Sequence, residues 1–395
     1  MPRLRQAALA IALGAAGTNL PALEYGALQL HGFASQALVH TSDNQYFGDS
    51  TKTSFDFTEL GVNASYRPDP RLLLSGQVLV RRAGEMYDGT PSIDYALADI
   101  TLSSSAEQRL GVRAGRYKAP MGLYNETRDV PFTRPGIFLP QVVYYDKIRN
   151  QLLSLDGLAL YGETYGDLGN LSLTLAAGRT LIDDNVEWTY LGSDYPGDLA
   201  SDGLAWLASL WYSSQTERLK LGFSISSYRM AFDPAANSPL DDGSIDAIYW
   251  IASAQYNARD WTISAEYSRV PLDWNDFGPV YPFTKETIEG YYLQGAYRLR
   301  PGLELMLRYE EGFANQTDKD GNRFSALTGG ITPSYDFYSK IWTAGLRWDI
   351  LPDLMLRLEY QRHLGTFALS IRENPDPSAL VEEWDAIAAA LSIRF

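Results

Sequence analysis

Cysteine is absent from the 395 residues of this chain, and histidine is nearly absent, with three residues. The lack of cysteine excludes a disulfide framework, a thiol nucleophile and a cysteine-ligated metal. Hydrolytic enzymes normally use a histidine general base, and no serine or aspartate spacing around His31, His40 or His363 marks a nucleophile site. No segment matches the twelve-residue calcium loop. We therefore expect no enzymatic activity, no metal and no cofactor.

Positive charge is also scarce. The formal net charge is −15 at pH 7. This balance argues against nucleic acid as a partner, because the phosphates of nucleic acid need a basic protein face. The mean hydropathy of −0.21 is too low for a protein built from membrane-spanning helices.

Long apolar runs are missing outside the N-terminus. Residues 1–5 carry two arginines, residues 6–17 are rich in alanine, leucine and isoleucine, and a small-residue site follows at Ala22. This order is typical of a secretory signal peptide. We predict a signal at residues 1–22, cleaved after Ala22, and an exported domain at residues 23–395. A retained N-terminal helix is the alternative, although the run is too short to span a bilayer.

Aromatic residues are plentiful, with 26 tyrosines and 9 tryptophans, and such rings gather at membrane interfaces. In residues 384–395, Ile387, Leu391, Ile393 and Phe395 share one face of an extended strand, because side chains alternate along a strand. Small and polar residues occupy the other face. A last strand that ends in phenylalanine resembles the C-terminal signature of bacterial outer-membrane β-barrels. The last strand of a soluble sheet is the alternative.

Alternating patterns continue along the chain, and most of the stretches have the length that a tilted strand needs to cross a bilayer. Their connections are predicted to alternate strictly between short turns and long loops, as in barrels with short periplasmic turns. An exported sheet can lie in lipid only if it closes. We therefore predict an all-β fold: a 16-stranded antiparallel transmembrane β-barrel in the outer membrane of a Gram-negative bacterium. The predicted strands are residues 28–39, 55–66, 72–82, 93–102, 110–117, 152–161, 171–181, 204–212, 219–230, 247–256, 261–269, 288–299, 303–311, 337–350, 354–364 and 384–395.

The longest connection, residues 118–150, combines apolar residues such as Ile137, Phe138 and Val142 with several cations. A loop surrounded by water has little reason to carry so much apolar surface. Sixteen strands also enclose an interior too wide for side chains alone to fill. We predict that this third outer loop folds inward and constricts the barrel. The predicted constriction cations are Lys118, Arg128, Arg134, Lys147 and Arg149 on the loop, and Arg81 and Arg113 on the adjacent wall.

Alternation places further arginines on the inner face of the wall. Glu266, Glu310 and Glu359 are predicted to face the same way and to neutralise these arginines in part. Each arginine has an alternative role as a salt-bridge partner that stiffens the wall. Only charges near the constriction are expected to set ion preference, since a watery lumen screens charges beyond about 8 Å. The predicted lumen-lining arginines are Arg298, Arg308, Arg347, Arg357 and Arg394.

Residues 115–123, with the sequence Gly-Arg-Tyr-Lys-Ala-Pro-Met-Gly-Leu, resemble the junction between a strand and the third loop in the phosphate-selective porin O and P family and its relatives. The local resemblance covers residues 110–150. It implies a passive diffusion channel for small hydrophilic solutes, with an inward third loop, a homotrimeric assembly and a preference for phosphate or other small anions. The loop lacks a lysine-rich cluster that would match a dedicated phosphate trap, and the N-terminal coiled coil of some relatives is missing.

The predicted outer loops are acidic, and residues 183–202 contain no basic residue. Acidic loops of this kind are explained by simple exposure to solvent. They are also explained by divalent cations, which prefer oxygen ligands and would bridge the loop carboxylates to lipopolysaccharide phosphates. Outer-membrane lipids and lipopolysaccharide are therefore the expected surroundings. Two further functions stay open. One is a barrel enzyme of the lipase or protease kind, and the other is a receptor or adhesin with a plugged lumen.

Overall fold

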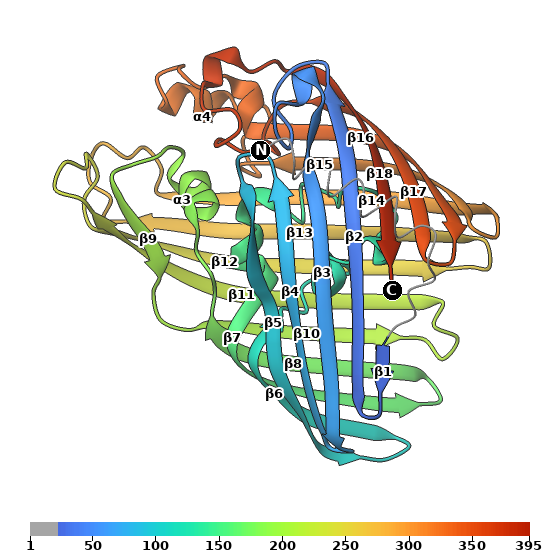
Figure 1. The fold of residues 1–395 in the computed structure, drawn as a ribbon. Coiled ribbons are helices and arrows are strands. Elements are labelled where there is room, and N and C mark those ends of the chain that lie inside the picture. Colours follow the sequence, from blue (N-terminus) through green and yellow to red (C-terminus); the bar gives the residue numbers. More distant parts are fainter. Residues whose placement is uncertain (1–22) are drawn as a thin grey trace.

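The structure is a computed structural model that describes residues 23–395. The predicted signal peptide lies outside the described residues. Sixteen strands form one closed antiparallel sheet (Figure 1). Their bounds are β2 (Leu28–Thr41), β3 (Ser54–Asp69), β4 (Leu72–Ala83), β5 (Tyr87–Ser104), β6 (Gln108–Lys118), β7 (Ser154–Gly166), β8 (Gly169–Arg179), β10 (Ala205–Ser213), β11 (Leu219–Pro234), β12 (Gly243–Asn257), β13 (Trp261–Asn275), β14 (Lys285–Arg300), β15 (Leu303–Phe313), β16 (Tyr338–Leu351), β17 (Leu354–Leu364) and β18 (Glu383–Arg394).

The barrel closes where β18 pairs with β2. At this seam the Phe395 backbone N–H donates to the Gly32 carbonyl at 2.9 Å, and the Gly32 N–H donates back at 3.0 Å. The Phe395 ring lies so close to Gly32 that a Cβ atom there would meet it at 2.3 Å. Two short strands complete the sheet: β1 (Leu23–Tyr25) pairs with β2, and β9 (Gly197–Ser201) pairs with the outer end of β11.

The predicted sixteen-stranded barrel is confirmed, and β17 has the predicted bounds. The prediction of strict alternation between short and long connections was wrong at one place. Only residues 84–86 join β4 to β5, because β5 begins at Tyr87. Residues 87–92 have the composition of a turn, yet they pair with the end of β4 through a register shift at Val80 and Arg82. A local bulge thus extends a strand that composition alone would end.

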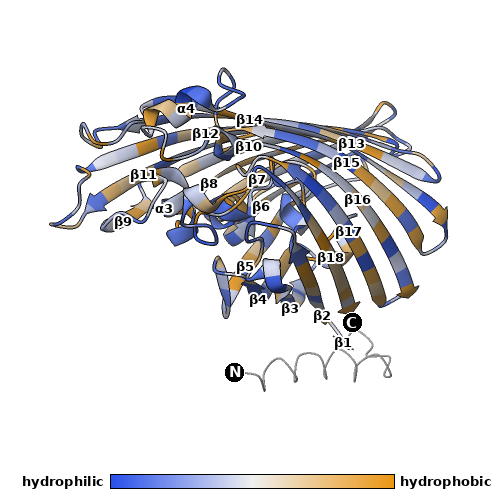
Figure 2. Cartoon of the chain, turned by 90° about the horizontal axis from the view of Figure 1, so that it is seen from above, coloured by the Kyte–Doolittle hydropathy of each residue, from blue (hydrophilic) through white to orange (hydrophobic). Residues whose placement is uncertain are grey.

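The outer surface of the barrel is apolar for a simple geometric reason. Successive strand residues point to opposite faces, so Leu305 and Leu307 of β15 face out while Met306 and Arg308 face in. Leu307 is 56% exposed, whereas Arg308 is 1% exposed. The same alternation is visible as changes of hydropathy along β16 and β17 (Figure 2). An apolar outer face over a polar inner face is the arrangement of a membrane barrel.

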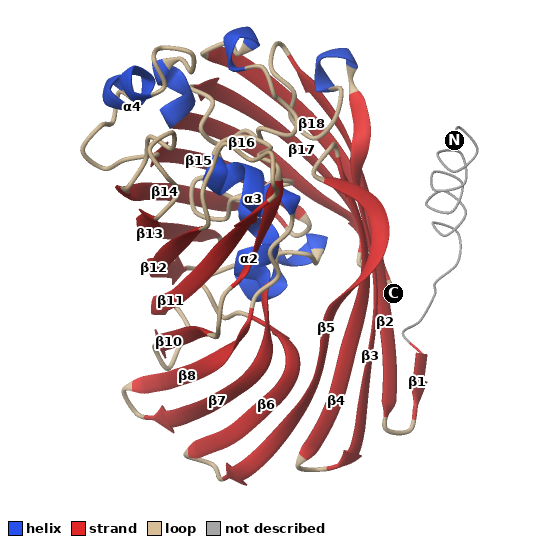
Figure 3. Cartoon of the chain, turned by 90° about the vertical axis from the view of Figure 1, so that its left-hand side faces the viewer, coloured by secondary structure: helices blue, strands red, loops and turns tan. Residues whose placement is uncertain are grey.

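The helices lie in the long connections at the outer end of the barrel or inside it (Figure 3). None of the helices in residues 23–395 is long and apolar enough to cross a membrane. The buried apolar core lies between the wall and these connections. The α-helices are α2 (Arg149–Leu153), α3 (Asp184–Leu191) and α4 (Asn322–Leu327), and the 3₁₀ helices are η1 (Ser50–Lys52), η2 (Asn125–Thr127), η3 (Pro131–Thr133), η4 (Asp146–Ile148), η5 (Ser334–Phe337) and η6 (Pro377–Ala379).

Candidate functional site

The connection between β6 and β7, residues 119–153, is called the inner segment below. Its apolar residues are buried, as the sequence predicts for Ile137, Phe138 and Val142. Phe138 stacks on Phe47 with ring centroids 5.0 Å apart. The backbone of the inner segment passes so close to β14 that a Cβ atom on Gly290 would lie 2.0 Å from the Val142 carbonyl oxygen. Only glycine permits this approach of two backbones.

Three glutamates on the wall hold the inner segment by its backbone. Glu266 of β13 accepts from the Leu123 N–H at 2.8 Å, and Glu359 of β17 accepts from the Ile137 N–H at 2.6 Å. Between them, Glu310 of β15 accepts a hydrogen bond of 3.3 Å from the Val142 N–H. Since the inner segment starts at β6 and reaches β17, it runs across the barrel interior.

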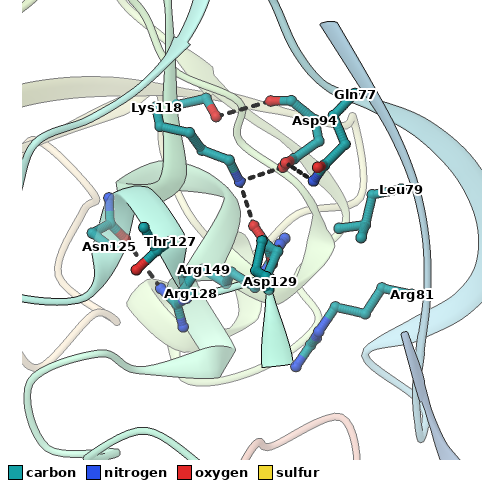
Figure 4. Close-up of polar contacts among 12 residues, drawn as sticks. Gln77, Leu79, Arg81, Asp94, Lys118, Asn125, Thr127, Arg128, Asp129 and Arg149 are labelled. Atoms are coloured by element: carbon teal, nitrogen blue, oxygen red, sulfur yellow. Dashed lines mark hydrogen bonds and ion pairs between the residues drawn. The ribbon is translucent and has the colours of Figure 1, made fainter. Parts of the chain in front are cut away.

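A cluster of buried charges fixes the inner segment to β3, β4 and β5 (Figure 4). The Lys118 ammonium contacts both Asp94 and Asp129, and Arg149 contacts the other oxygen of Asp129. Arg81 donates to Asp146 at 2.9 Å. Buried charges are tolerated only when each has a partner. The cluster consists of Arg81, Lys118, Arg128, Arg134 and Arg149 together with Glu59, Asp94, Asp129 and Asp146.

The arginines and lysine of this cluster control the ionisation of its loop carboxylates. Burial acts to raise the pKa of Asp129, but Arg149 and Lys118 outweigh it and hold the pKa well below its usual value. Burial acts in the same way on Asp146, and Arg81 and Arg128 lower its pKa. Both carboxylates are therefore ionised at neutral pH. The cluster is a set of fixed charges that binds the inner segment to the wall.

The predicted constriction cations fall into two groups. Five of the seven, namely Arg81, Lys118, Arg128, Arg134 and Arg149, are members of the buried cluster. Lys147 is half-buried at the outer end, and Arg113 keeps 30% of its side chain exposed beside Asp99. Their role in ion selection stays a prediction. The five cations of the buried cluster make the contacts expected of the alternative role, that of salt-bridge partners.

The predicted lumen-lining arginines also divide. Arg308 donates to the Phe138 carbonyl at 3.1 Å and Arg357 bonds the Gly136 carbonyl, so the inner segment covers both. Arg298 is exposed. Arg347 is partly exposed and donates to the Phe132 carbonyl at 3.1 Å. Arg394 is exposed, with its guanidinium 4.4 Å from the centroid of the Phe132 ring. Glu266, Glu310 and Glu359 face inward as predicted, and Glu310 and Glu359 pair with Arg308. All three also hold the inner segment.

The four carboxylates of the buried cluster were not predicted from the sequence. One of them had a readable signal, because Glu59 lies on β3 directly opposite Arg81 of β4, and cross-strand neighbours of opposite charge interact. Asp129 lies in a turn and Asp146 begins the short 3₁₀ helix η4, so neither belongs to a segment long enough to show a side-chain period. Within residues 23–395, no group of histidine and acidic side chains is placed to hold a metal ion.

No family model matches the chain, and no curated protein matches it. Several solved structures are similar in fold. The outer-membrane expressed OmpT of Vibrio cholerae has a TM-score of 0.58 at 12% identity, over 95% of this chain and 100% of that one. The outer membrane channel DcaP of Acinetobacter baumannii has a TM-score of 0.55 at 13% identity, over 95% of this chain and 100% of that one. The anion-selective porin from Comamonas acidovorans has a TM-score of 0.56 at 12% identity, over 93% of this chain and 99% of that one. The chain therefore has the fold of outer-membrane porins.

Proposed function

We propose that the protein is an outer-membrane porin, a passive diffusion channel for small hydrophilic solutes. One observation carries the proposal: the inner segment runs across the interior of a closed sixteen-stranded barrel. A barrel of this size encloses more space than wall side chains can fill. A segment held across that space sets the width of the path that remains, and residues 118–150 act as the constriction.

The surroundings of the barrel follow from its outer face. Leucines and aromatic rings on that face, such as Leu307 and Trp342, are more than half exposed, and they suit the lipids of the outer membrane. A signal peptide at residues 1–22 would supply export. Lipopolysaccharide is the proposed partner of the acidic outer loops. The fold likeness to outer-membrane channels supports this location.

We propose a modest preference for small anions, with phosphate among them. The buried cluster has five cations and four carboxylates, so its formal charge is 5 − 4 = +1. The water-accessible inner wall adds Arg113, Arg298, Arg347 and Arg394. Acidic neighbours such as Asp349, 2.9 Å from Arg347, reduce the effect. The similar fold of an anion-selective porin agrees with this sign.

We propose a homotrimer as the working assembly. The apolar outer wall supports subunit contact within a membrane, and the Vibrio cholerae OmpT has been described in a trimer form. The measurement is the mass of the unheated protein in mild detergent. A trimer mass that falls to the monomer mass on heating is the expected result. A monomer mass under all conditions would refute the trimer.

The porin is tested by single-channel recording in a planar bilayer with a salt gradient. We expect discrete conductance steps and a reversal potential of the sign for anion preference. A cation preference would refute the proposed anion preference but not the porin function. Absence of conductance would refute the porin and favour a receptor or adhesin with a closed lumen.

We propose no enzymatic activity. His363 stacks on Trp384 at 3.7 Å between ring centroids and bonds Gln361 at 2.9 Å, which describes a wall residue. His40 lies near Thr53, with 3.1 Å between Nδ1 and Oγ1. Alanine at each histidine is expected to leave lipid and peptide hydrolysis at the background level of the wild type. Hydrolysis by the wild type that these variants lose would overturn this part.

A further inference from the structure

A cavity of ≈ 330 Å³ lies among the outer connections. Its volume is that of a small-molecule site. The inner segment, the connections that follow β8, β13, β15 and β17, and the outer ends of β12 and β13 all contribute to its walls. Its aromatic lining includes Tyr145, Tyr190, Tyr249, Trp274, Tyr281 and Phe283.

The aromatic rings of this cavity are held in place by hydrogen bonds. The Trp274 indole N–H donates to the Tyr190 carbonyl at 3.1 Å, and the Tyr281 hydroxyl donates to the same carbonyl at 2.7 Å. The Trp274 and Phe283 rings lie 6.2 Å apart, and those of Tyr281 and Phe283 lie 5.7 Å apart, edge to face. Rings fixed in this way form a preorganised apolar wall that suits another flat ring.

Two polar groups in the cavity lack the partners that such groups usually have. The Lys147 ammonium bonds only the Phe367 carbonyl, and within residues 23–395 no carboxylate lies at ion-pair distance from it. It sits 4.2 Å from the centroid of the Phe367 ring. The Tyr145 hydroxyl is buried and has no hydrogen-bond partner among the described residues. An unpaired buried hydroxyl is costly unless a ligand or water completes it.

The acidic groups of the cavity are already engaged. Asp336 accepts from the Thr366 hydroxyl at 2.8 Å, and Glu286 contacts Asn315 and Arg323. Burial raises the pKa of Asp336 to about 6 and lowers the pKa of Lys147 to about 8, and the attraction between these two opposite charges opposes both shifts. Lys147 is therefore mostly protonated at neutral pH, and it is the charge with spare hydrogen-bonding capacity.

We propose that this cavity is an outer binding site for a small aromatic carboxylate. The ring of the ligand packs among Trp274, Tyr281 and Phe283, and its carboxylate accepts from the Lys147 ammonium and the Tyr145 hydroxyl. A sugar would need several free polar partners, and inorganic phosphate would gain nothing from aromatic walls. An amine would find both acidic groups engaged. In a porin, this cavity would be the first site to capture a solute, and that role rests on the proposed porin function.

The test is calorimetric binding of benzoate to the full chain in lipid nanodiscs at pH 7, with acetate, benzylamine and glucose as comparison solutes. We expect saturable binding of benzoate and at least tenfold weaker binding of the other three. Lys147→Met should weaken benzoate binding at least tenfold, Lys147→Arg should restore most of it, and Tyr145→Phe should weaken it severalfold. Native folding is checked in each variant by retention of heat-dependent gel mobility.

Lys220→Met is the matched control, because Lys220 also lies over an aromatic ring, 4.9 Å from the Trp211 centroid, but outside this cavity. It should bind benzoate as the wild type does. Absence of saturable benzoate binding, equal binding by Lys147→Met, or tighter binding of glucose or benzylamine would overturn the proposal. Conductance without benzoate binding would refute the binding site but not the porin function. Benzoate binding without conductance would refute the porin function but not the binding site.

Discussion

Arg81 and Arg347 are both inward-facing arginines of the barrel wall, and both contact the inner segment, yet their access to water differs. Arg81 lies beneath the inner segment at 6% exposure, between Glu59 and Asp146. Arg347 keeps 22% of its side chain exposed, and its partner Asp349 keeps 35%. Removing water makes an ion pair several times stronger, since the effective dielectric constant falls. The direction of a side chain and its access to water are thus separate properties.

This difference assigns two kinds of role to one residue type. Arginines that the inner segment buries attach it to the wall. Inward arginines that keep access to water, here called uncovered, contribute to the field that a solute meets, and among them Arg347 also donates to the Phe132 carbonyl at 3.1 Å. Strand alternation sorts residues into inner and outer faces, but it cannot tell a covered inner position from an uncovered one. The predictions below separate these two roles.

Deletion of residues 125–145 should have the largest effect. It removes most of the cover from the inner wall, and we expect single-channel conductance to rise severalfold. A matched deletion of residues 235–239, in the outer connection between β11 and β12, should leave the conductance near that of the wild type. Equal conductance of the two deletion variants would contradict the constriction.

Asp129→Asn should strongly destabilise the barrel, because it leaves Arg149 buried without a carboxylate and leaves Lys118 with Asp94 alone. Breaking a buried pair in this way costs about 3–5 kcal/mol. The matched change on the uncovered wall, Asp349→Asn, should cost less than about 1 kcal/mol, as exposed pairs do. Urea unfolding of the reconstituted proteins measures both free energies. A similar loss in the two variants would remove the distinction between the two walls.

Acid should release the inner segment only at low pH. The pKa of Asp129 and the pKa of Asp146 are lowered in the folded protein. Their contribution to stability is therefore present above the unfolded pKa of about 4, and it is lost as the pH falls through the lower folded values. We expect conductance to be steady from pH 7 to about pH 4 and to rise below that range. A rise that begins near pH 6 would show that groups other than Asp129 and Asp146 control the release of the inner segment.

The smallest expected effect concerns ion preference. Changing Arg298 and Arg347 to serine together should shift the reversal potential toward cations by a few millivolts, since both side chains reach water. Arg128→Ser and Arg134→Ser should shift it less and should reduce stability instead, because both arginines are buried in ion pairs. If Arg128→Ser and Arg134→Ser shifted the reversal potential more than the Arg298 and Arg347 changes, ion selection would depend on the inner segment, as the sequence predicts.

Much of the barrel is readable from the sequence because its rules are local. Apolar and polar side chains alternate from Leu356 to Gln361, and the strand has the predicted bounds of residues 354–364. The extension of β5 to Tyr87 is not readable, since its turn-like residues pair only after a register shift in β4. Pairing partners across a bulge depend on the neighbouring strand and not on local composition.

The candidate site is less readable than the wall. The apolar content of residues 118–150 predicts burial, and Ile137 and Val142 are buried. The carboxylates that neutralise its cations are separated from them in sequence, as Lys118 and Asp94 are. Side-chain direction in irregular backbone follows from tertiary contacts alone. The sequence therefore predicts which segment is buried but not which charges it meets.

The seam between β18 and β2 has a consequence for how the molecule assembles. Ser35 and Ser392 share a hydrogen bond of 2.8 Å across 357 positions of sequence. Contacts of such long range carry the largest loop-closure entropy and form slowly. We therefore infer that the sheet grows from neighbouring hairpins and that its first and last long strands meet late. The inner segment has to take its place among the growing strands before the ring shuts, since a finished wall would leave it no lateral way in.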